Sequence, residues 1–239
     1  MQIATVLPRK TLDCIHCEHR SLRMFCNLSE AALQHYAGIG VQKSFLRGSI
    51  LFRENSRSDG VFILCTGQVK LSCTSKEGKT LILKIAMPGD VLGLGAVISQ
   101  SQYEVTAETI QPAEIKSIRR EDFIAFLEKY GEGSLHAAKA ISDDYKAAFF
   151  DARRLALSGS AGAKLAGVLL DWGKSAAACG KFEMRFTMAL THEELANMIG
   201  TSRETVTRTL AKFKREHLIQ IKGSSILILA PSLLEQLSA

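Results

Sequence analysis

The sequence predicts an α+β protein with an N-terminal double-stranded β-helix (jelly-roll) barrel, a long helix and a C-terminal winged helix-turn-helix. Between Val41 and Arg120, apolar and polar residues alternate as in strands with one buried face, and glycines recur at turn positions. Helical spacing then resumes, and residues 134–157 contain neither proline nor glycine. The last third carries a helix pair and two strand-like runs, LIQIK and ILIL, around a short turn.

Composition places the chain among ordinary globular proteins. Of its 239 residues, 46% are hydrophobic and 23% are charged, and the formal net charge is +6. No apolar run is long enough to cross a bilayer, and the N-terminus lacks the pattern of a signal peptide, so we expect a cytoplasmic protein without a membrane partner. In that setting the six cysteines are expected to be free thiols or metal ligands rather than disulfides.

Segment boundaries follow from changes in pattern. Within the barrel, Val69, Leu71 and Cys73 alternate with polar residues in a strand, SKEGK supplies a turn, and TLILKIA returns. The small-residue run LSGSAG after the long helix is the expected hinge. The expected segments are a cysteine-rich N-terminus (1–30), a β-roll sensor domain (31–132), a dimerisation helix (133–157) and a winged helix-turn-helix domain (158–239).

Two short helices joined by a glycine turn are predicted in THEELANMIGTSRETVTRTLAKF. Thr191 opens the first with capping-box spacing, and Gly200 ends it in a left-handed conformation. Thr201 and Glu204 repeat that spacing and open the second helix.

The second of these helices has the residues of a DNA-reading helix. Val206, Leu210 and Phe213 recur at helical spacing and are expected to face inward. Arginine, glutamate and hydroxyl side chains on the opposite arc suit the base edges of the major groove. The alternative is an amphipathic hairpin with a solvated charged face. The expected base-reading residues are Arg203, Glu204, Thr207 and Arg208.

Cations and hydroxyls around this helix predict phosphate contacts. The local excess of Lys and Arg favours a polyanionic partner, here double-stranded DNA, and the final hairpin would be a wing with a lysine at its tip. The expected phosphate contacts are Thr201, Ser202, Thr205, Lys212 and Lys222.

The long helix carries an apolar stripe close to a three-four repeat. Such a stripe favours pairing with its own copy in a homodimer. The alternative is a long core helix packed on its own domain. The stripe residues expected at the dimer contact include Leu135, Ile141, Tyr145, Phe149 and Ala152.

This order of barrel, long helix and winged helix-turn-helix resembles the CRP/FNR family of bacterial transcription regulators. CTGQVKLSCTSKEGKTLILKIAMPGDVLG is similar to the family's glycine-spaced, cyclic-nucleotide-binding-like roll, and IGTSRETVTRTL to the recognition helix of its cyclic-AMP receptor branch. The resemblance implies that Arg203, Glu204 and Arg208 read a palindrome of TGTGA-like half-sites, and that RNA polymerase is a partner. As the last member of the Thr201 capping box, Glu204 is also expected to bond the first amide of its own helix, which competes with a contact to a base.

Cyclic AMP is not expected in the roll. The binding branch needs a Gly-Glu-Leu turn and a later Arg-Ser pair for the cyclic phosphate. This chain has Gly93-Leu94-Gly95, and no arginine stands at Tyr103, Glu104 or Val105. A buried phosphate without a cation would be costly.

The N-terminal cysteines resemble the FNR branch in part. That branch holds an oxygen-labile [4Fe–4S] cluster with N-terminal cysteines and one barrel cysteine. Cys14 and Cys17 match the start of the motif, but Cys26 follows after a longer gap, and Lys116 stands at the fourth position. Cys65 and Cys73 lie on strand faces that alternation marks as interior.

Three hypotheses remain for Cys14, Cys17 and Cys26. They are an iron–sulfur cluster completed by Asp13, His16 or His19, a zinc site, and a thiol set without metal.

The sequence therefore favours a cytoplasmic homodimeric transcription regulator that is not an enzyme and that senses oxygen or redox state through its N-terminal cysteines. The rival hypotheses are a metalloenzyme built on the Cys/His group, and a zinc- or iron–sulfur-binding redox protein whose C-terminal helices serve protein contacts.

Overall fold

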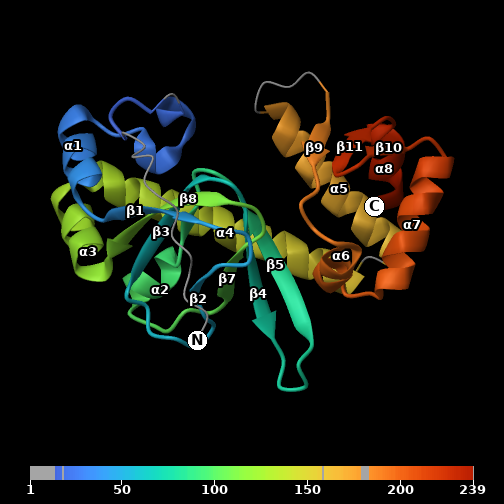
Figure 1. Ribbon diagram of the computed structural model, residues 1–239, viewed down its shortest axis with the longest axis horizontal. Helices are drawn as coiled ribbons and strands as arrows, with labels where there is room; N and C mark the ends of the chain where they lie inside the picture. Colours follow the sequence, from blue (N-terminus) through green and yellow to red (C-terminus); the bar gives the residue numbers. More distant parts are fainter. Residues whose placement is uncertain (1–13, 18, 158, 179–182, 239) are drawn as a thin grey trace. The chain divides into compact units, whose positions relative to one another are not determined.

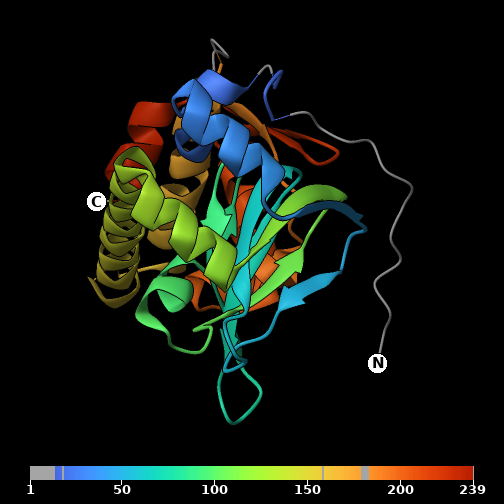
Figure 2. The same cartoon turned by 90° about the vertical axis from the view of Figure 1, so that its left-hand side faces the viewer.

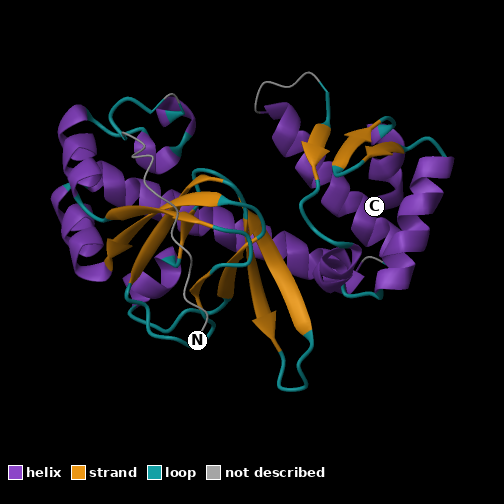
Figure 3. Ribbon diagram, in the orientation of Figure 1, coloured by secondary structure: helices purple, strands orange, loops and turns teal. Residues whose placement is uncertain are grey.

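The computed structural model describes residues 14–17, 19–157, 159–178 and 183–238. Backbone contacts divide the chain into two compact units, residues 1–147 and 148–239. Figure 1 traces both units along the sequence, and Figure 3 separates their helices from their strands. The first unit contains the roll with its flanking helices, and the second contains the helix pair and a small sheet.

The roll is built from two antiparallel sheets, as predicted. One sheet has the strand order β1-β8-β3-β6, and the other has the order β2-β7-β4-β5. β4 and β5 continue as a long hairpin that ends at the SKEGK turn, where Gly78 has φ +81°. The strands are β1 (Val41–Phe45), β2 (Ile50–Phe52), β3 (Gly60–Thr66), β4 (Val69–Thr74), β5 (Thr80–Ala86), β6 (Val91–Leu92), β7 (Thr106–Thr109) and β8 (Ala113–Arg119).

Burial along β4 differs from the alternation predicted for it. Ser72 is buried, whereas Cys73, which was expected to be interior, is half-exposed. The pairing of β4 with β5 shifts at this point, because Leu83 of β5 has no residue opposite it between Leu71 and Ser72.

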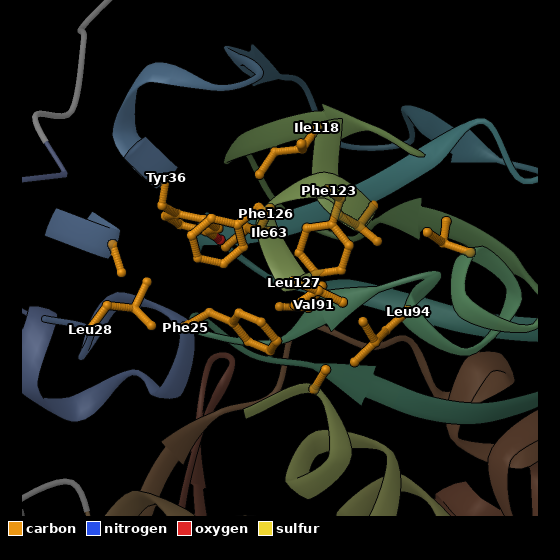
Figure 4. Close-up of a cluster of buried hydrophobic side chains, with 14 of the residues drawn as sticks. Phe25, Leu28, Tyr36, Ile63, Val91, Leu94, Ile118, Phe123, Phe126 and Leu127 are labelled. Atoms are coloured by element: carbon orange, nitrogen blue, oxygen red, sulfur yellow. The ribbon is translucent and has the colours of Figure 1, made fainter. Parts of the chain in front are cut away.

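Short helices cover the outer face of the first sheet. In Figures 1 and 2 the blue helix α1 lies beside α3. Figure 4 shows the cluster between them and the sheet, in which Phe25 and Tyr36 meet Ile63 of β3 and Phe126 of α3. These helical elements are η1 (Arg20–Leu22), η2 (Met24–Cys26), α1 (Glu30–Gly38) and α3 (Arg120–Lys129).

Aromatic side chains fill the interior of the roll. Tyr103, only 3% exposed, stacks on Phe52 with ring centroids 4.0 Å apart. Its hydroxyl donates to the Gly60 carbonyl at 2.5 Å. Gly93 precedes a short helix, α2 (Leu94–Ser99), that the sequence analysis did not predict. A Cβ at Gly93 would lie 2.6 Å from the Tyr103 ring, so this packing requires glycine.

Helix α4 (Gly131–Leu157) follows α3 directly. Its first turn is tied to α1, because Glu132 accepts hydrogen bonds from the Ser29 amide (2.9 Å) and from the Ser29 hydroxyl. No helix in the described ranges is both long enough and apolar enough to cross a membrane.

The second unit has the predicted helix pair and hairpin, with one addition. The extra strand β9 pairs with β11, so the hairpin becomes part of a small antiparallel sheet in the order β10-β11-β9. The closing helix was predicted from PSLLEQL. The elements are α5 (Ala161–Ala178), β9 (Arg185–Thr187), α6 (His192–Ile199), α7 (Arg203–Arg215), β10 (Ile219–Lys222), β11 (Ser225–Ile228) and α8 (Pro231–Ser238). Ser158, in the expected hinge, lies outside the described residues.

Candidate nucleic-acid interface and thiol site

The first helix of the pair begins and ends as its sequence predicts. The Thr191 hydroxyl accepts from the Glu194 amide at 3.2 Å, and the Glu194 carboxylate accepts from the Thr191 amide at 2.9 Å. Both halves of the capping box are therefore present. Gly200 ends α6 in the left-handed region, with φ 66° and ψ 46°.

The start of the second helix differs by one residue from the prediction. Ser202, rather than Thr201, is the N-cap of α7, and its hydroxyl accepts from the Thr205 amide at 3.3 Å. Thr201 instead belongs to the turn, where its amide donates to the Ala196 carbonyl at 3.0 Å. The sequence could not distinguish two adjacent hydroxyl residues that both favour a cap.

Helix α7 separates an apolar face from a polar one. Val206, Leu210 and Phe213 are at most 3% exposed and pack inward, as predicted. Arg203 and Arg208 are exposed on the other side. The helix therefore presents guanidinium groups to solvent while its buried face fixes its orientation in the unit.

Glu204 is exposed but engaged at the helix start. Hydrogen bonds from its own amide and from the Ser202 hydroxyl lower the pKa of its carboxyl, and Arg203 and Arg208 contribute in the same direction. The capping box expected of Thr201 and Glu204 is not the one that forms, because Ser202 is the N-cap; the Glu204 carboxylate bonds its own amide and the Ser202 hydroxyl instead.

The two threonines of the arc make contacts within the helix pair. The Thr207 hydroxyl donates to the Arg203 carbonyl at 3.0 Å and lies 2.8 Å from Nδ1 of His192 on α6. The Thr205 hydroxyl lies 3.1 Å from the Ser202 hydroxyl and 3.5 Å from Nη2 of Arg208. His192 is therefore a neighbour of the reading face that the sequence analysis missed.

The expected phosphate-binding cations lie on the surface around this helix. Lys212 is exposed on the last turns of α7, where Lys214 and Arg215 add further positive charge. Lys222 is the exposed last residue of β10, beside the tight turn at Gly223. The turn residue Thr201 is half-exposed and Ser202 is exposed, which leaves both hydroxyls at the surface.

Comparisons with known proteins identify both parts of the chain. Residues 42–130 match the model of the cyclic nucleotide-binding domain, and residues 163–237 match that of the Crp-like helix-turn-helix domain. The chain belongs to the CRP/FNR family of DNA-binding transcription regulators.

CRP/FNR relatives match along almost the full chain. The transcriptional activatory protein AadR of Rhodopseudomonas palustris is 25% identical over 94% of this chain and 92% of its own length. The nitrogen fixation regulation protein FixK of Bradyrhizobium diazoefficiens is 24% identical over 95% and 94%. The solved structure of FixK2 from Bradyrhizobium japonicum, 19% identical, has a TM-score of 0.76 and covers 84% of this chain and 98% of its own.

The cysteines of this CRP/FNR chain are not confined to its N-terminus. Cys14 and Cys17 precede η1 and Cys26 ends η2, all three half-exposed, while Cys65 on β3 is buried. Burial, together with the neighbouring Cys14 and Cys17, raises the pKa of Cys26 to about 11. Burial likewise raises the pKa of Cys65 to about 12, with Cys14 and Cys26 adding to the shift.

Cys65 is buried, as expected. Leu64, the residue before it, packs in the roll's interior cluster. Both faces of β3 are covered, so burial alone does not show which way the Cys65 side chain points.

A single bound ion is not favoured at these cysteines. Within the ranges that the structure describes, no three His, Cys, Asp or Glu side chains are grouped to hold one metal ion. This observation counts against zinc at Cys14, Cys17 and Cys26. Asp13, one of the expected non-cysteine ligands, lies outside the described residues.

Proposed function

We propose that this protein is a homodimeric regulator that reads a palindromic DNA site with helix α7. The observation that carries the proposal is the arrangement of that helix. Its apolar face is buried against the unit, and Arg203, Glu204, Thr207 and Arg208 are exposed along one arc. Arginine can donate two hydrogen bonds to guanine, and glutamate can accept from cytosine, so this arc offers direct readout of base edges.

Surface groups on either side of the arc would position the helix on the duplex. Ser202 and the turn residue Thr201 lie at its start, Lys212 lies near its end, and Lys222 projects from the wing. Phosphate contacts of this kind fix register and orientation without reading sequence. Thr205 joins them with its hydroxyl beside Arg208.

Exposed apolar residues on α4 support the dimer. Tyr145 is 71% exposed, Phe149 61%, Leu135 55% and Ile141 38%, and Ala152 is also exposed. Contiguous apolar surface of this kind mostly marks an interface. A two-fold pairing of two such helices would present two reading helices about one DNA turn apart, as a palindrome requires.

The sensory input is proposed to differ from cyclic AMP. Tyr103 is buried against Phe52 and bonded to Gly60, so this segment packs the interior of the roll instead of supplying a cation for a phosphate. Glu104 is exposed and negative beside it. The N-terminal cysteines are the proposed input for oxygen or redox state. We further infer that the protein acts in the cytoplasm with RNA polymerase as a partner, and that it is not an enzyme.

Fluorescence anisotropy with a labelled duplex tests this function. The probe carries TGTGA and its inverted repeat, and the control duplex has both half-sites scrambled. We expect tighter binding to the palindrome, two chains per duplex, and an affinity that falls steeply with salt. Equal affinity for both duplexes, or no binding at low salt, would instead favour the rival hypothesis that the C-terminal helices serve protein contacts.

A further inference from the structure

We propose that Thr207 reads a thymine base through its methyl group, and that His192 is the positioning residue that holds this methyl toward the DNA. The inference rests on the proposed role of α7 as the reading helix, and it assigns the kind of base that one residue of the helix contacts. It differs from the expectation drawn from the sequence, in which the hydroxyl group of the threonine meets a base edge.

The hydroxyl group of Thr207 is already engaged within the helix pair. It donates to the Arg203 carbonyl, one turn earlier on α7, at 3.0 Å. It also lies 2.8 Å from Nδ1 of His192, the first residue of α6. A carbonyl oxygen only accepts, so the single hydroxyl proton goes to Arg203. No proton is left for an acceptor on a base, such as O6 and N7 of guanine or O4 of thymine.

The same count of protons fixes the tautomer of His192. Because the Thr207 hydroxyl donates to Arg203, the donor of the 2.8 Å contact is Nδ1 of His192. A neutral imidazole carries one N–H, so Nε2 is then an acceptor and cannot donate to a phosphate oxygen. In this state the histidine acts on the reading face through Thr207.

His192 is itself held at the start of α6. It follows the N-cap Thr191, whose hydroxyl accepts from the Glu194 amide at 3.2 Å and whose amide donates to the Glu194 carboxylate at 2.9 Å. The histidine side chain is half-buried. Helices α6 and α7 pack together (Figure 1), and Leu195 on the first and Val206 on the second are 0% exposed. The imidazole therefore holds a side chain of α7 from a fixed position.

The methyl group is the part of Thr207 that remains free to meet the DNA. Thr207 is exposed on the same arc as Arg203 and Arg208. A threonine in a helix divides between two rotamers, because its hydroxyl can bond a carbonyl of the preceding turn. Here the bonds to Arg203 and His192 select one rotamer and leave the methyl unengaged. In the major groove a threonine methyl packs on the C5-methyl group that only thymine presents.

Thr209 provides a matched comparison on the same helix. Its hydroxyl donates to the Thr205 carbonyl at 2.8 Å, which is the same bond to the preceding turn. Thr209 is half-buried, however, and a Cβ at Gly162 of α5 would lie 4.0 Å from its methyl carbon. The methyl of Thr209 thus faces α5, whereas Thr207 lies on the exposed arc. Removing each methyl in turn separates a DNA contact from a packing effect.

Removal of thymine methyl groups from the DNA tests the contact. Fluorescence anisotropy of the full chain is measured on the TGTGA palindrome and on duplexes in which one thymine of each half-site, on either strand in turn, is deoxyuridine. Deoxyuridine lacks only the C5-methyl group. We expect wild type to lose affinity by about fourfold per half-site at one thymine position, as for one methyl group removed from water. Equal affinity for thymine and deoxyuridine at every position would overturn the proposal.

Two substitutions of Thr207 separate its methyl from its hydroxyl. Thr207→Ser keeps the hydroxyl, so the deoxyuridine effect at that position should disappear. Thr207→Val keeps a methyl, so the effect should remain. Thr209→Ser is the matched control and should behave as wild type. An effect that persists in Thr207→Ser, or one that vanishes in Thr207→Val because the hydroxyl accepts from a base amino group, would overturn the reading by the methyl.

The positioning role of His192 is tested by a pair of variants. His192→Asn keeps a side-chain N–H donor near the position of Nδ1 and should retain the deoxyuridine effect. His192→Ala should reduce the effect to about twofold or less, because the threonine then divides between its two rotamers. A full effect in His192→Ala would show that the histidine does not hold the methyl in place.

The tautomer of His192 can be measured in wild-type protein, without any variant and without DNA. Nitrogen-15 NMR of the full chain at about pH 8, where histidine is neutral, should show the proton on Nδ1. A proton on Nε2 would overturn the positioning role. A chain that has no affinity for the palindrome contradicts the proposed function, whereas one that binds it without regard to thymine methyl groups contradicts this inference alone.

Discussion

Lys84 on β5 forms an ion pair with Asp144 on α4, with Nζ and Oδ1 2.8 Å apart. Asp90 lies on the other side of the same ammonium at 3.2 Å. Burial lowers the pKa of Lys84, but the two carboxylates outweigh it and the net shift is upward. The returning strand of the hairpin is thus tied to the helix proposed to pair two copies, which provides a route from the roll to the dimer contact.

Asp144→Asn should loosen this connection. Because Asp144 is about half-exposed, the loss should be at most about 1 kcal/mol, in the range of surface ion pairs. Hydrogen exchange of the α4 amides near residue 144 should become faster. Asp143→Asn, next to it and 3.8 Å from Lys146, is the control. If the two variants exchange at the same rate, Lys84 does not restrain the helix.

Replacing Tyr145 and Phe149 together by alanine should weaken the dimer at least tenfold. Each aromatic ring would lose about 1.5–3 kcal/mol of burial at the contact. Sedimentation equilibrium measures the change, with Asp143→Ala on another face of the helix as the control. Double-variant and wild-type chains with the same dimer dissociation constant would exclude this stripe from the interface.

The Ser29–Glu132 contact predicts an acid-sensitive attachment of α1. Hydrogen bonds from the Ser29 hydroxyl and amide lower the pKa of Glu132 in the folded state. A lowered folded pKa stabilises the fold above the ordinary pKa, and the contribution is lost as pH falls through the lowered value. The advantage of wild type over Glu132→Gln in melting temperature should therefore be present at pH 7, begin to shrink near the ordinary pKa of about 4.3, and be lost as the pH falls through the lowered value.

Melting of the first unit can be followed by the near-ultraviolet circular dichroism of the tyrosines. The single tryptophan, Trp172, lies in the second unit. The exposed Glu128→Gln is the control. A difference between wild type and Glu132→Gln that does not shrink as the pH falls below about 4 would show that the Glu132 charge is not its source.

The helix pair could be predicted from the sequence because capping residues and helical periodicity depend only on residues a few positions apart. Thr191, Gly200 and the stripe of Val206, Leu210 and Phe213 were all placed correctly by capping and periodicity. Ser202 was missed as the cap because Thr201 beside it has the same chemistry.

Tertiary contacts decided the features that the sequence did not predict. The pairing shifts beside Ser72 and beside Cys65 interrupt ladders that look regular in the sequence.

Lys222 at the wing should strengthen binding to any DNA duplex through its charge, without preference for a base sequence. Lys222→Ala should weaken binding to the palindrome and to the scrambled duplex by the same factor, and reduce the slope of log K against log salt by about 1. Anisotropy titrations at several salt concentrations measure the slope. The matched control is Lys76→Ala at the hairpin tip of the roll. An unchanged slope in Lys222→Ala would remove the wing from the DNA contact.

The most direct test of DNA reading by α7 is selection of bound sequences from a random DNA pool by wild type and Arg203→Ala. Wild type should enrich an inverted repeat, and the variant should lose preference at one base pair of each half-site, at a cost of about 1–3 kcal/mol per contact. Enrichment of the same repeat with the same preference at every position by both chains would contradict the assignment of this helix as the reader.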